Sequence, residues 1–205
     1  MKNVIYVSKK IIKASKNEIF IIKNILFTYF RKSNYNSKVF CIGYNKTGTT
    51  TLGKSLEMLG YKNSSFNRRI YRKYYLTKNY SKILKYTAKF ESFDDLPWLK
   101  EDMIPILDKT FPESKFIYLT RDENEWKKSF YNWTYKVKGH YPDIEKGWED
   151  YKNHEKFVLD YFKTHPKKDF IILNVKDKYG FEKLALFLGK ESFRKSFPRF
   201  NESSN

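Results

Sequence analysis

A loop bounded by two glycines, between an apolar run and an amphipathic helix, constrains the fold of this chain most. The run 38–43 predicts a buried strand, and 49–59 predicts a helix with its leucines on one face. Between them, Gly43 and Gly48 have the G-x-x-x-x-G spacing with which a phosphate-binding loop opens. The free N–H groups and the dipole of the following helix attract anions. The sequence therefore predicts a strand, an anion-binding loop and a helix in succession.

The rest of the chain continues this alternation of strands and helices. Strands are predicted at 86–92, 115–120 and 170–175, and helices at 103–111, from 122 to about 135, at 148–162 and at 181–188, with one or two more within 61–85. Strands separated by helices pair in parallel, so we expect a three-layer α/β fold with a central, mostly parallel sheet covered on both faces. The loops after Gly43, Ser92, Thr120 and Val175 should meet around one site.

The glycine loop departs from that of nucleoside triphosphatases. Those proteins require Lys and then Ser or Thr after the second glycine, but position 49 is Thr. The lysine lies inside the loop instead, at Lys46. The loop is thus suited to a phosphate-like anion but not to a Mg²⁺–nucleoside triphosphate. The alternative is a simple strand–helix turn that contains glycine.

A second anion site is predicted after the third strand. Arg121 follows the run 116–120, and Ser129 lies eight residues later, about two helical turns along. A guanidinium fork and a hydroxyl could together hold a separate phosphate. Alternatively, Arg121 pairs with a local carboxylate and Ser129 is a helix-surface residue.

The amino-acid composition restricts the class of binding partner only slightly. The 205 residues carry a net charge of +18, which favours an anionic partner, although the preponderance of Lys over Arg is also what an AT-rich coding sequence would give. A single cysteine, Cys41, excludes an intramolecular disulfide framework and is expected to be a buried core residue. The three histidines have no metal-ligand spacing, so no metal site is expected.

We interpret residues 1–37 as a separate, basic amphipathic segment that precedes a domain at 38–205. Its most apolar part, 19–30, is shorter than the ~20 residues that span a bilayer, and no signal-peptide cleavage site follows. Two interpretations remain, a helix packed on the domain or a helix lying on a membrane. A cytoplasmic or peripheral membrane location is expected, and the oligomeric state is left open.

Four separate segments resemble one family. Lys46-Thr47-Gly48-Thr49-Thr50 is similar to the phosphosulfate-binding loop of sulfotransferases that use 3′-phosphoadenosine 5′-phosphosulfate (PAPS). The stretch from Phe111 through Arg121 to Ser129 resembles their 3′-phosphate motif. Asp95-Leu96-Pro97-Trp98 matches an Asp-x-Pro-Trp element of the compact, single-domain branch, and Leu188-Gly189 with 197–201 resembles its carboxyl terminus. Asn45 and Thr51 depart from the residues that many members carry there.

The resemblance implies roles for these residues. The backbone of Thr47–Thr51, with the hydroxyls of Thr50 and Thr51, would hold the 5′ end of PAPS, and Arg121 with Ser129 the 3′-phosphate. Lys46 would neutralise charge as the P–O–S bond breaks, with adenosine 3′,5′-bisphosphate (PAP) as the product. A sulfuryl group carries less negative charge than a phosphoryl group, so no metal is expected.

The acceptor side is less defined by the sequence. No histidine lies between Lys46 and Arg121, so an acidic residue is expected as the base: Asp95 is preferred, with Asp94 and Glu91 as alternatives. Asp95 could instead cap the following helix. The acceptor, a small molecule or a glycan, could meet aromatic residues within 130–141 or the basic residues Arg68, Arg69, Arg72 and Lys73, although these could equally be core and solvated surface.

Two other classes of protein compete with a sulfotransferase. A small-molecule kinase on the same fold would bind ATP with Mg²⁺, which the missing Lys-Ser/Thr pair disfavours. A non-catalytic binder of nucleic acid or another polyanion would show uniform, steeply salt-dependent binding. Once the motifs are considered, the net charge no longer argues for a nucleic acid.

Overall fold

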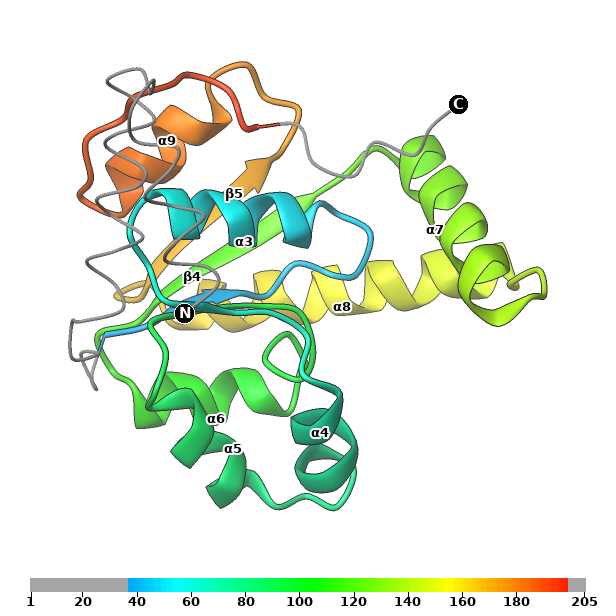
Figure 1. Cartoon of the computed structure of the whole chain (residues 1–205), viewed down its shortest axis with the longest axis horizontal. Coiled ribbons are helices and arrows are strands. Elements are labelled where there is room, and N and C mark those ends of the chain that lie inside the picture. The colour runs from blue at the N-terminus through cyan, green and yellow to red at the C-terminus, as the bar shows by residue number, and fades with distance from the viewer. Residues whose placement is uncertain (1–36, 199–205) are drawn as a thin grey trace, which may run out of the picture.

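The computed structural model describes residues 37–198, and its fold is a parallel five-stranded sheet between two layers of helices (Figure 1). The strands are β1 (Val39–Cys41), β2 (Asn63–Ser64), β3 (Ser92–Asp94), β4 (Lys115–Thr120) and β5 (Asp169–Asn174). They are ordered β2-β3-β1-β4-β5, and every pair is parallel. The expected α/β class and its predominantly parallel sheet are confirmed.

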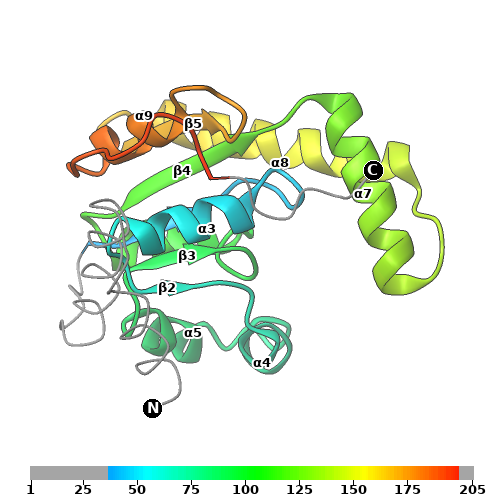
Figure 2. The same ribbon diagram turned by 45° about the horizontal axis from the view of Figure 1, so that its top comes forward.

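The helices connect the strands in sequence. They are α3 (Thr49–Met58), α4 (Arg68–Ile70), the π-helical turn η2 (Tyr71–Tyr75), α5 (Tyr80–Thr87), α6 (Met103–Thr110), α7 (Glu123–Lys138), α8 (Ile144–Thr164) and α9 (Gly180–Phe187). Helix α7 begins at a capped turn, because the Asp122 carboxylate accepts from the N–H of Glu125 at 3.1 Å. Figure 2 shows α7 extending away from the sheet at one end of the molecule.

Alternate residues of each strand build two cores on opposite faces of the sheet. Phe40 and Phe116 face one core, which is closed by side chains of α5, α6 and α8. Cys41 and Ile117 face the other, closed by α3 and α9. All four side chains are fully buried, as expected for strands whose residues alternate between two covered faces. The expectation that Cys41 lies in the core is confirmed.

One predicted strand is wrong. Residues 86–92 were expected to form a strand, but Tyr86 and Thr87 end helix α5 and only Ser92 belongs to β3. Tyr86 in the last turn of α5 and Phe90 just beyond the helix pack their rings together, with centroids 5.0 Å apart. The aromatic run was therefore a helix end rather than a strand. Strand β2, two polar residues long, has no apolar pattern that could have revealed it.

The order of the strands creates a crevice at the carboxyl end of β1. The chain leaves β1 to build β2 and β3 on one side, and then β4 and β5 on the other. Ligands of open α/β sheets bind where the strand order reverses in this way. A ligand site is therefore expected among the residues that follow β1, β3 and β4.

Two general features complete the fold. Within residues 37–198, no helix is both long enough and apolar enough to cross a membrane. The predicted basic segment at 1–37 lies outside the described residues except for its last position, and so do residues 199–201 of the carboxyl-terminal match.

Candidate functional site

The loop after β1 is held in a shape that only its glycines permit. Gly48, the residue before α3, has φ of 105°, and a Cβ there would lie 2.8 Å from a methyl group of Val175. A Cβ on Gly43 would lie 2.8 Å from the backbone nitrogen of Leu119. At both positions a side chain would collide with a neighbouring residue, so glycine is required. Gly48 also has a left-handed backbone conformation that favours glycine.

Side chains from three other parts of the chain bind the carbonyl groups of this loop. Arg121, directly after β4, donates from Nη1 to the carbonyl of Lys46 at 2.7 Å. Trp126 of α7 donates from Nε1 to the carbonyl of Asn45, also at 2.7 Å.

Two further contacts complete this set. The His154 Nε2 of α8 lies 2.7 Å from the Ile42 carbonyl, and inside the loop the Thr47 hydroxyl donates to the Tyr44 carbonyl at 2.6 Å. Because these carbonyl groups are engaged, they are fixed in orientation.

The N–H groups of the loop are left free by the same arrangement. No N–H from Lys46 to Thr51 donates to an acceptor anywhere in residues 37–198, and the first intrahelical bond of α3 is the one from Leu52 to Gly48. Neither a side-chain cap nor an acidic residue is present in the first turn of α3. Six consecutive backbone N–H groups without an acceptor, at the N-terminus of a helix, are typical of an anion-binding site.

The threonines of the loop differ in exposure. Thr47 is fully buried, and Thr49 and Thr51 are 7% and 8% exposed. Thr50 is exposed at the start of α3. The hydroxyl of Thr50 can therefore reach a ligand without rearrangement, while Thr47 has a structural part in the loop.

Lys46 and Asp95 lie near one another, and each perturbs the other. Burial, and then the charge of Arg121, lower the pKa of Lys46, while Asp95 acts in the opposite direction. Burial raises the pKa of Asp95, and the N–H of Leu96 and the Lys46 ammonium oppose that rise. A carboxylate and a lysine that are both partly desolvated and electrostatically coupled in a crevice are typical of functional sites.

Asp95 also has an unusual backbone. Its φ is 98°, which is rare for a residue with a Cβ, and its Oδ1 accepts from the N–H of Leu96 at 2.6 Å. That acceptor bond goes to the adjacent residue rather than to the first turn of a helix, so Asp95 does not cap a helix. The strained turn directs Asp95 differently from Asp94, which is the last residue of β3.

Asp94 is engaged in packing. It is 2% exposed, and its Oδ1 accepts from Asn63 Nδ2 at 2.6 Å and from Ser65 Oγ at 2.7 Å. Burial is the main reason why the pKa of Asp94 is raised to about 7. A Cβ on Gly53 of α3 would lie 2.5 Å from its carboxyl carbon. Asp94 thus joins β2 and α3 to the sheet.

The third acidic candidate lies elsewhere. Glu91 precedes β3, and its carboxylate accepts from the N–H of Lys62 at 2.9 Å. It is therefore at the amino end of the strand, a full strand length from Asp95. Of the three acidic candidates, the structure brings only Asp95 and Asp94 to the carboxyl end of the sheet.

Arg121 and Ser129 are placed on the side of β4 and α7. Arg121 forms an ion pair with Glu125 at 3.8 Å as well as its bond to the loop, and its remaining N–H groups can serve a ligand. Ser129 is half-buried on α7 and makes no side-chain hydrogen bond within residues 37–198. The structure joins Arg121 to the loop directly, but it shows no contact between Arg121 and Ser129.

Sequence reasoning missed His154 altogether, and it did not foresee the contacts of Trp126, within the matched stretch 111–129, or of Trp133, among the aromatic residues at 130–141. Trp126 and His154 support the loop as described. Trp133 of α7 lies beneath the Lys46 ammonium, which is 5.1 Å from the ring centroid. Arg121 and Lys46 were found from motif spacing, but nothing local marks a histidine 112 residues beyond Ile42 as its partner.

No metal-binding cluster is seen in the described region. Residues 37–198 contain no group of three or more His, Cys, Asp or Glu side chains placed to share an ion. Apart from the Asp95 carboxylate, the polar groups described at the site are donors, namely the loop N–H groups, the Lys46 ammonium and the Arg121 guanidinium. The site is thus suited to an anionic ligand.

Together, these features define an α/β protein with an anion-binding loop at the switch point of a parallel sheet. Comparison with known families assigns it further: the sulfotransferase domain matches residues 38–144. The chain belongs to this family. The match runs from β1 to the first residue of α8 and includes Lys46, Asp95, Arg121 and Ser129. No curated protein matches the chain significantly.

Proposed function

We propose that this protein transfers a sulfuryl group from PAPS to a hydroxyl or amine of an acceptor. The observation that carries the proposal is the loop at 43–51: Trp126 and Arg121 bind its Asn45 and Lys46 carbonyl groups, while the N–H groups from Lys46 to Thr51 remain free. Such a loop offers a rigid set of donors to an anion without first having to break bonds of its own. Family membership supports sulfuryl transfer as the reaction.

The donor would be held by two anion sites. The N–H groups of Thr47–Thr51, with the exposed Thr50 hydroxyl, would bind its 5′-phosphosulfate, and the Thr51 hydroxyl would assist. Arg121 and Ser129 would bind its 3′-phosphate. Because Arg121 also holds the Lys46 carbonyl, the occupation of one site would be mechanically linked to the shape of the other.

Lys46 would stabilise the leaving group. In the transfer, the acceptor oxygen or nitrogen forms a bond to sulfur, the bond from sulfur to the 5′-phosphate oxygen breaks, and that oxygen gains negative charge. The Lys46 ammonium would neutralise this charge, an effect typically of about 3–4 kcal/mol for one well-placed donor. Its perturbed pKa reflects the desolvated position that makes such a charge effective.

Asp95 would take the proton that the acceptor loses. Burial raises its pKa towards the range in which a carboxylate accepts a proton usefully, and the Lys46 ammonium opposes part of that rise. Asp94 is less suited to this role, because Asn63 and Ser65 already donate to one of its oxygens and α3 covers it.

The acceptor would contact α7. Trp133 is 39% exposed and lies against Lys46, so its ring offers an exposed aromatic surface beside the proposed reaction centre. Further along, the exposed Tyr141 stacks on both Tyr131 and Tyr135, with ring centroids 5.0 and 4.8 Å away. Flat aromatic surfaces of this kind suit a sugar face or a phenolic ring.

A ligand-dependent thermal unfolding experiment tests the donor. Adenosine 3′,5′-bisphosphate at ~100 times its dissociation constant should stabilise the protein by ~2.7 kcal/mol. The Arg121→Ala variant should lose this stabilisation, whereas Lys128→Ala, an exposed charge change on α7, should retain it. Stabilisation by ATP with Mg²⁺ alone would contradict the proposal and indicate a nucleoside-triphosphate enzyme.

A further inference from the structure

Half of the net charge of this protein comes from one segment of thirty residues. Residues 61–90 contain nine Lys and Arg and no Asp or Glu, which gives +9 of the total +18. In the structure this segment forms β2, α4, η2 and α5 beside the edge of the sheet. The charge is therefore concentrated locally rather than spread evenly.

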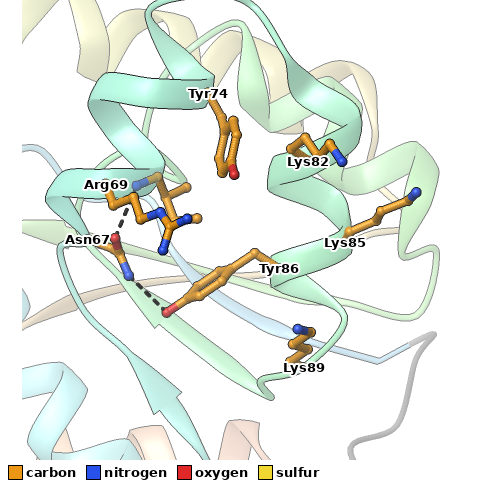
Figure 3. Close-up of a pocket in the computed structure, with 8 residues that line it drawn as sticks. Asn67, Arg69, Tyr74, Lys82, Lys85, Tyr86 and Lys89 are labelled. Carbon is orange, nitrogen blue, oxygen red and sulfur yellow. Dashed lines mark hydrogen bonds between the residues drawn. The ribbon is translucent and has the colours of Figure 1, made fainter.

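The segment lines an open pocket of about 300 Å³. Figure 3 shows α4 and η2 on one side of it and α5 on the other. The lining residues are Asn67, Arg69, Ile70, Tyr74, Lys82, Lys85, Tyr86 and Lys89. Four of these eight residues are cationic and none is acidic.

Ion pairing separates the four pocket cations from eight other lysines of the described residues. Those eight form ion pairs with Asp or Glu: Lys54, Lys115, Lys127, Lys146, Lys152, Lys168, Lys176 and Lys183. Within residues 37–198, Arg69, Lys82, Lys85 and Lys89 have no such partner. Their charges are thus available to a ligand, and their mutual repulsion would be relieved by an anion.

The wall between these cations is fixed. The Tyr86 hydroxyl lies 3.0 Å from Ser64 Oγ and accepts from Asn67 Nδ2 at 3.2 Å, and the Asn67 Oδ1 accepts from the N–H of Ile70 at 3.0 Å (Figure 3). The Tyr86 ring also stacks on Trp98, with centroids 6.0 Å apart. The Tyr86 side chain is therefore held by hydrogen bonds at its hydroxyl and by packing at its ring. Its ring gives the pocket a rigid apolar surface.

We propose that this pocket is an anion-binding site separate from the loop at 43–51. Its ligand is a compact group with at least two negative charges, such as sulfate or phosphate. Arg69 binds it from α4, and Lys82, Lys85 and Lys89 bind it from the side of α5. The arginine supplies a planar fork, and the lysines supply flexible ammonium groups that can turn towards the ligand. When the anionic groups are carried by a sugar ring, that ring packs against Tyr74 and Tyr86.

Calorimetric titration of the full chain with two probes tests the site and the source of the anion. The probes are inorganic pyrophosphate and a sulfated disaccharide, at about 0.15 M salt, where long-range attraction is screened beyond about 8 Å. Binding of both probes with similar affinity identifies a free anion as a sufficient ligand. Binding of the disaccharide alone identifies an anionic carbohydrate. Binding of neither probe overturns the proposal.

Matched variants distinguish the pocket from the general positive charge. The triple change Lys82→Gln, Lys85→Gln and Lys89→Gln should weaken binding about tenfold or more, and Arg69→Gln on the opposite wall should weaken it severalfold. The control changes Lys156→Gln, Lys163→Gln and Lys167→Gln remove the same charge from exposed positions in and after α8. Equal losses in the two triple variants would overturn the proposal. Unchanged affinity for adenosine 3′,5′-bisphosphate in the pocket variants shows that the protein is folded and that its donor site is intact.

Discussion

The indole N–H of Trp126 donates to the backbone carbonyl of Asn45 at 2.7 Å, although 81 residues separate them. Trp126 is fully buried, and its ring stacks on Phe130 with centroids 4.8 Å apart. The loop at 43–51 is thus held by a side chain that is itself immobilised in α7. Donor binding should depend on this contact even though Trp126 lies behind the loop.

Trp126→Phe tests the contact without emptying the core. The change keeps an aromatic ring but removes the donor to Asn45, so the loop loses one buried hydrogen bond of about 1–2 kcal/mol. We expect the affinity for adenosine 3′,5′-bisphosphate, measured by calorimetry, to fall about five- to tenfold. Trp148→Phe is the control, because Trp148 belongs to the same aromatic cluster, 4.6 Å from Tyr151, but donates no hydrogen bond within residues 37–198. Equal losses in both variants would assign the effect to packing instead.

Asp95→Asn should separate catalysis from donor binding. If Asp95 accepts the acceptor's proton, its amide replacement should lower kcat about 10²–10⁴-fold and leave donor affinity within about twofold. Glu113→Gln is the control, because Glu113 is exposed and lies just before β4, at the amino ends of the strands and away from the site. Normal turnover by Asp95→Asn in a steady-state assay would exclude Asp95 as the base.

The pH profile provides an independent check on Asp95. The carboxylate must be unprotonated to accept a proton, so kcat/KM should rise with pH through the pKa of Asp95. Because burial raises that pKa, the acidic limb should lie above the ordinary aspartate value of about 3.9. An acidic limb at or below the ordinary value would show that the group controlling activity is not a desolvated Asp95.

Gly48→Ala should damage the loop through both strain and overlap. A side chain there needs φ of 105° and meets Val175, so we expect a loss of about 2–4 kcal/mol in the free energy of unfolding. Gly139→Ala isolates the first effect, since Gly139 also has a positive φ, 72°, but open space around its Cβ position; about 1 kcal/mol is expected. The second change Val175→Ala should restore part of the loss in Gly48→Ala. Urea unfolding measures all three, and no recovery in the double variant would rule out overlap with Val175.

Asp94 should make folding stability depend on pH. Its pKa is about 7 in the folded protein and about 3.9 when unfolded, so the folded state holds the proton more tightly. Below pH ~4 both states are protonated and this contribution is fully present. It is lost as the pH rises to ~7, and the full loss is on the order of 4 kcal/mol.

Asp94→Asn removes this titration. Between about pH 4 and 7, the free energy of unfolding from urea titrations should therefore fall less with pH in Asp94→Asn than in the wild type. Asp160 is an exposed residue of α8, so Asp160→Asn should keep the wild-type dependence of the free energy of unfolding on pH. Identical slopes in the wild type and Asp94→Asn would contradict a raised pKa at Asp94.

Local sequence patterns determined much of this protein. The spacing from Gly43 to Gly48, the leucines of α3 and the alternating residues of β4 are short-range signals, because backbone geometry repeats every 3.6 residues in a helix and every two in a strand. They were sufficient to predict the parallel α/β class and to mark Lys46 and Arg121. They failed at residues 86–90, where an aromatic pair at helical spacing was interpreted as a strand.

The tertiary structure alone decided how the site is assembled. It placed His154 against Ile42 and Trp126 against Asn45, and it directed Asp94 into α3 while Asp95 turned towards Lys46. It also gathered unpaired cations of residues 61–90 around one pocket. These relationships join residues far apart along the chain, and no local periodicity encodes them. They follow from which faces of the helices must be buried when the two layers close over the sheet.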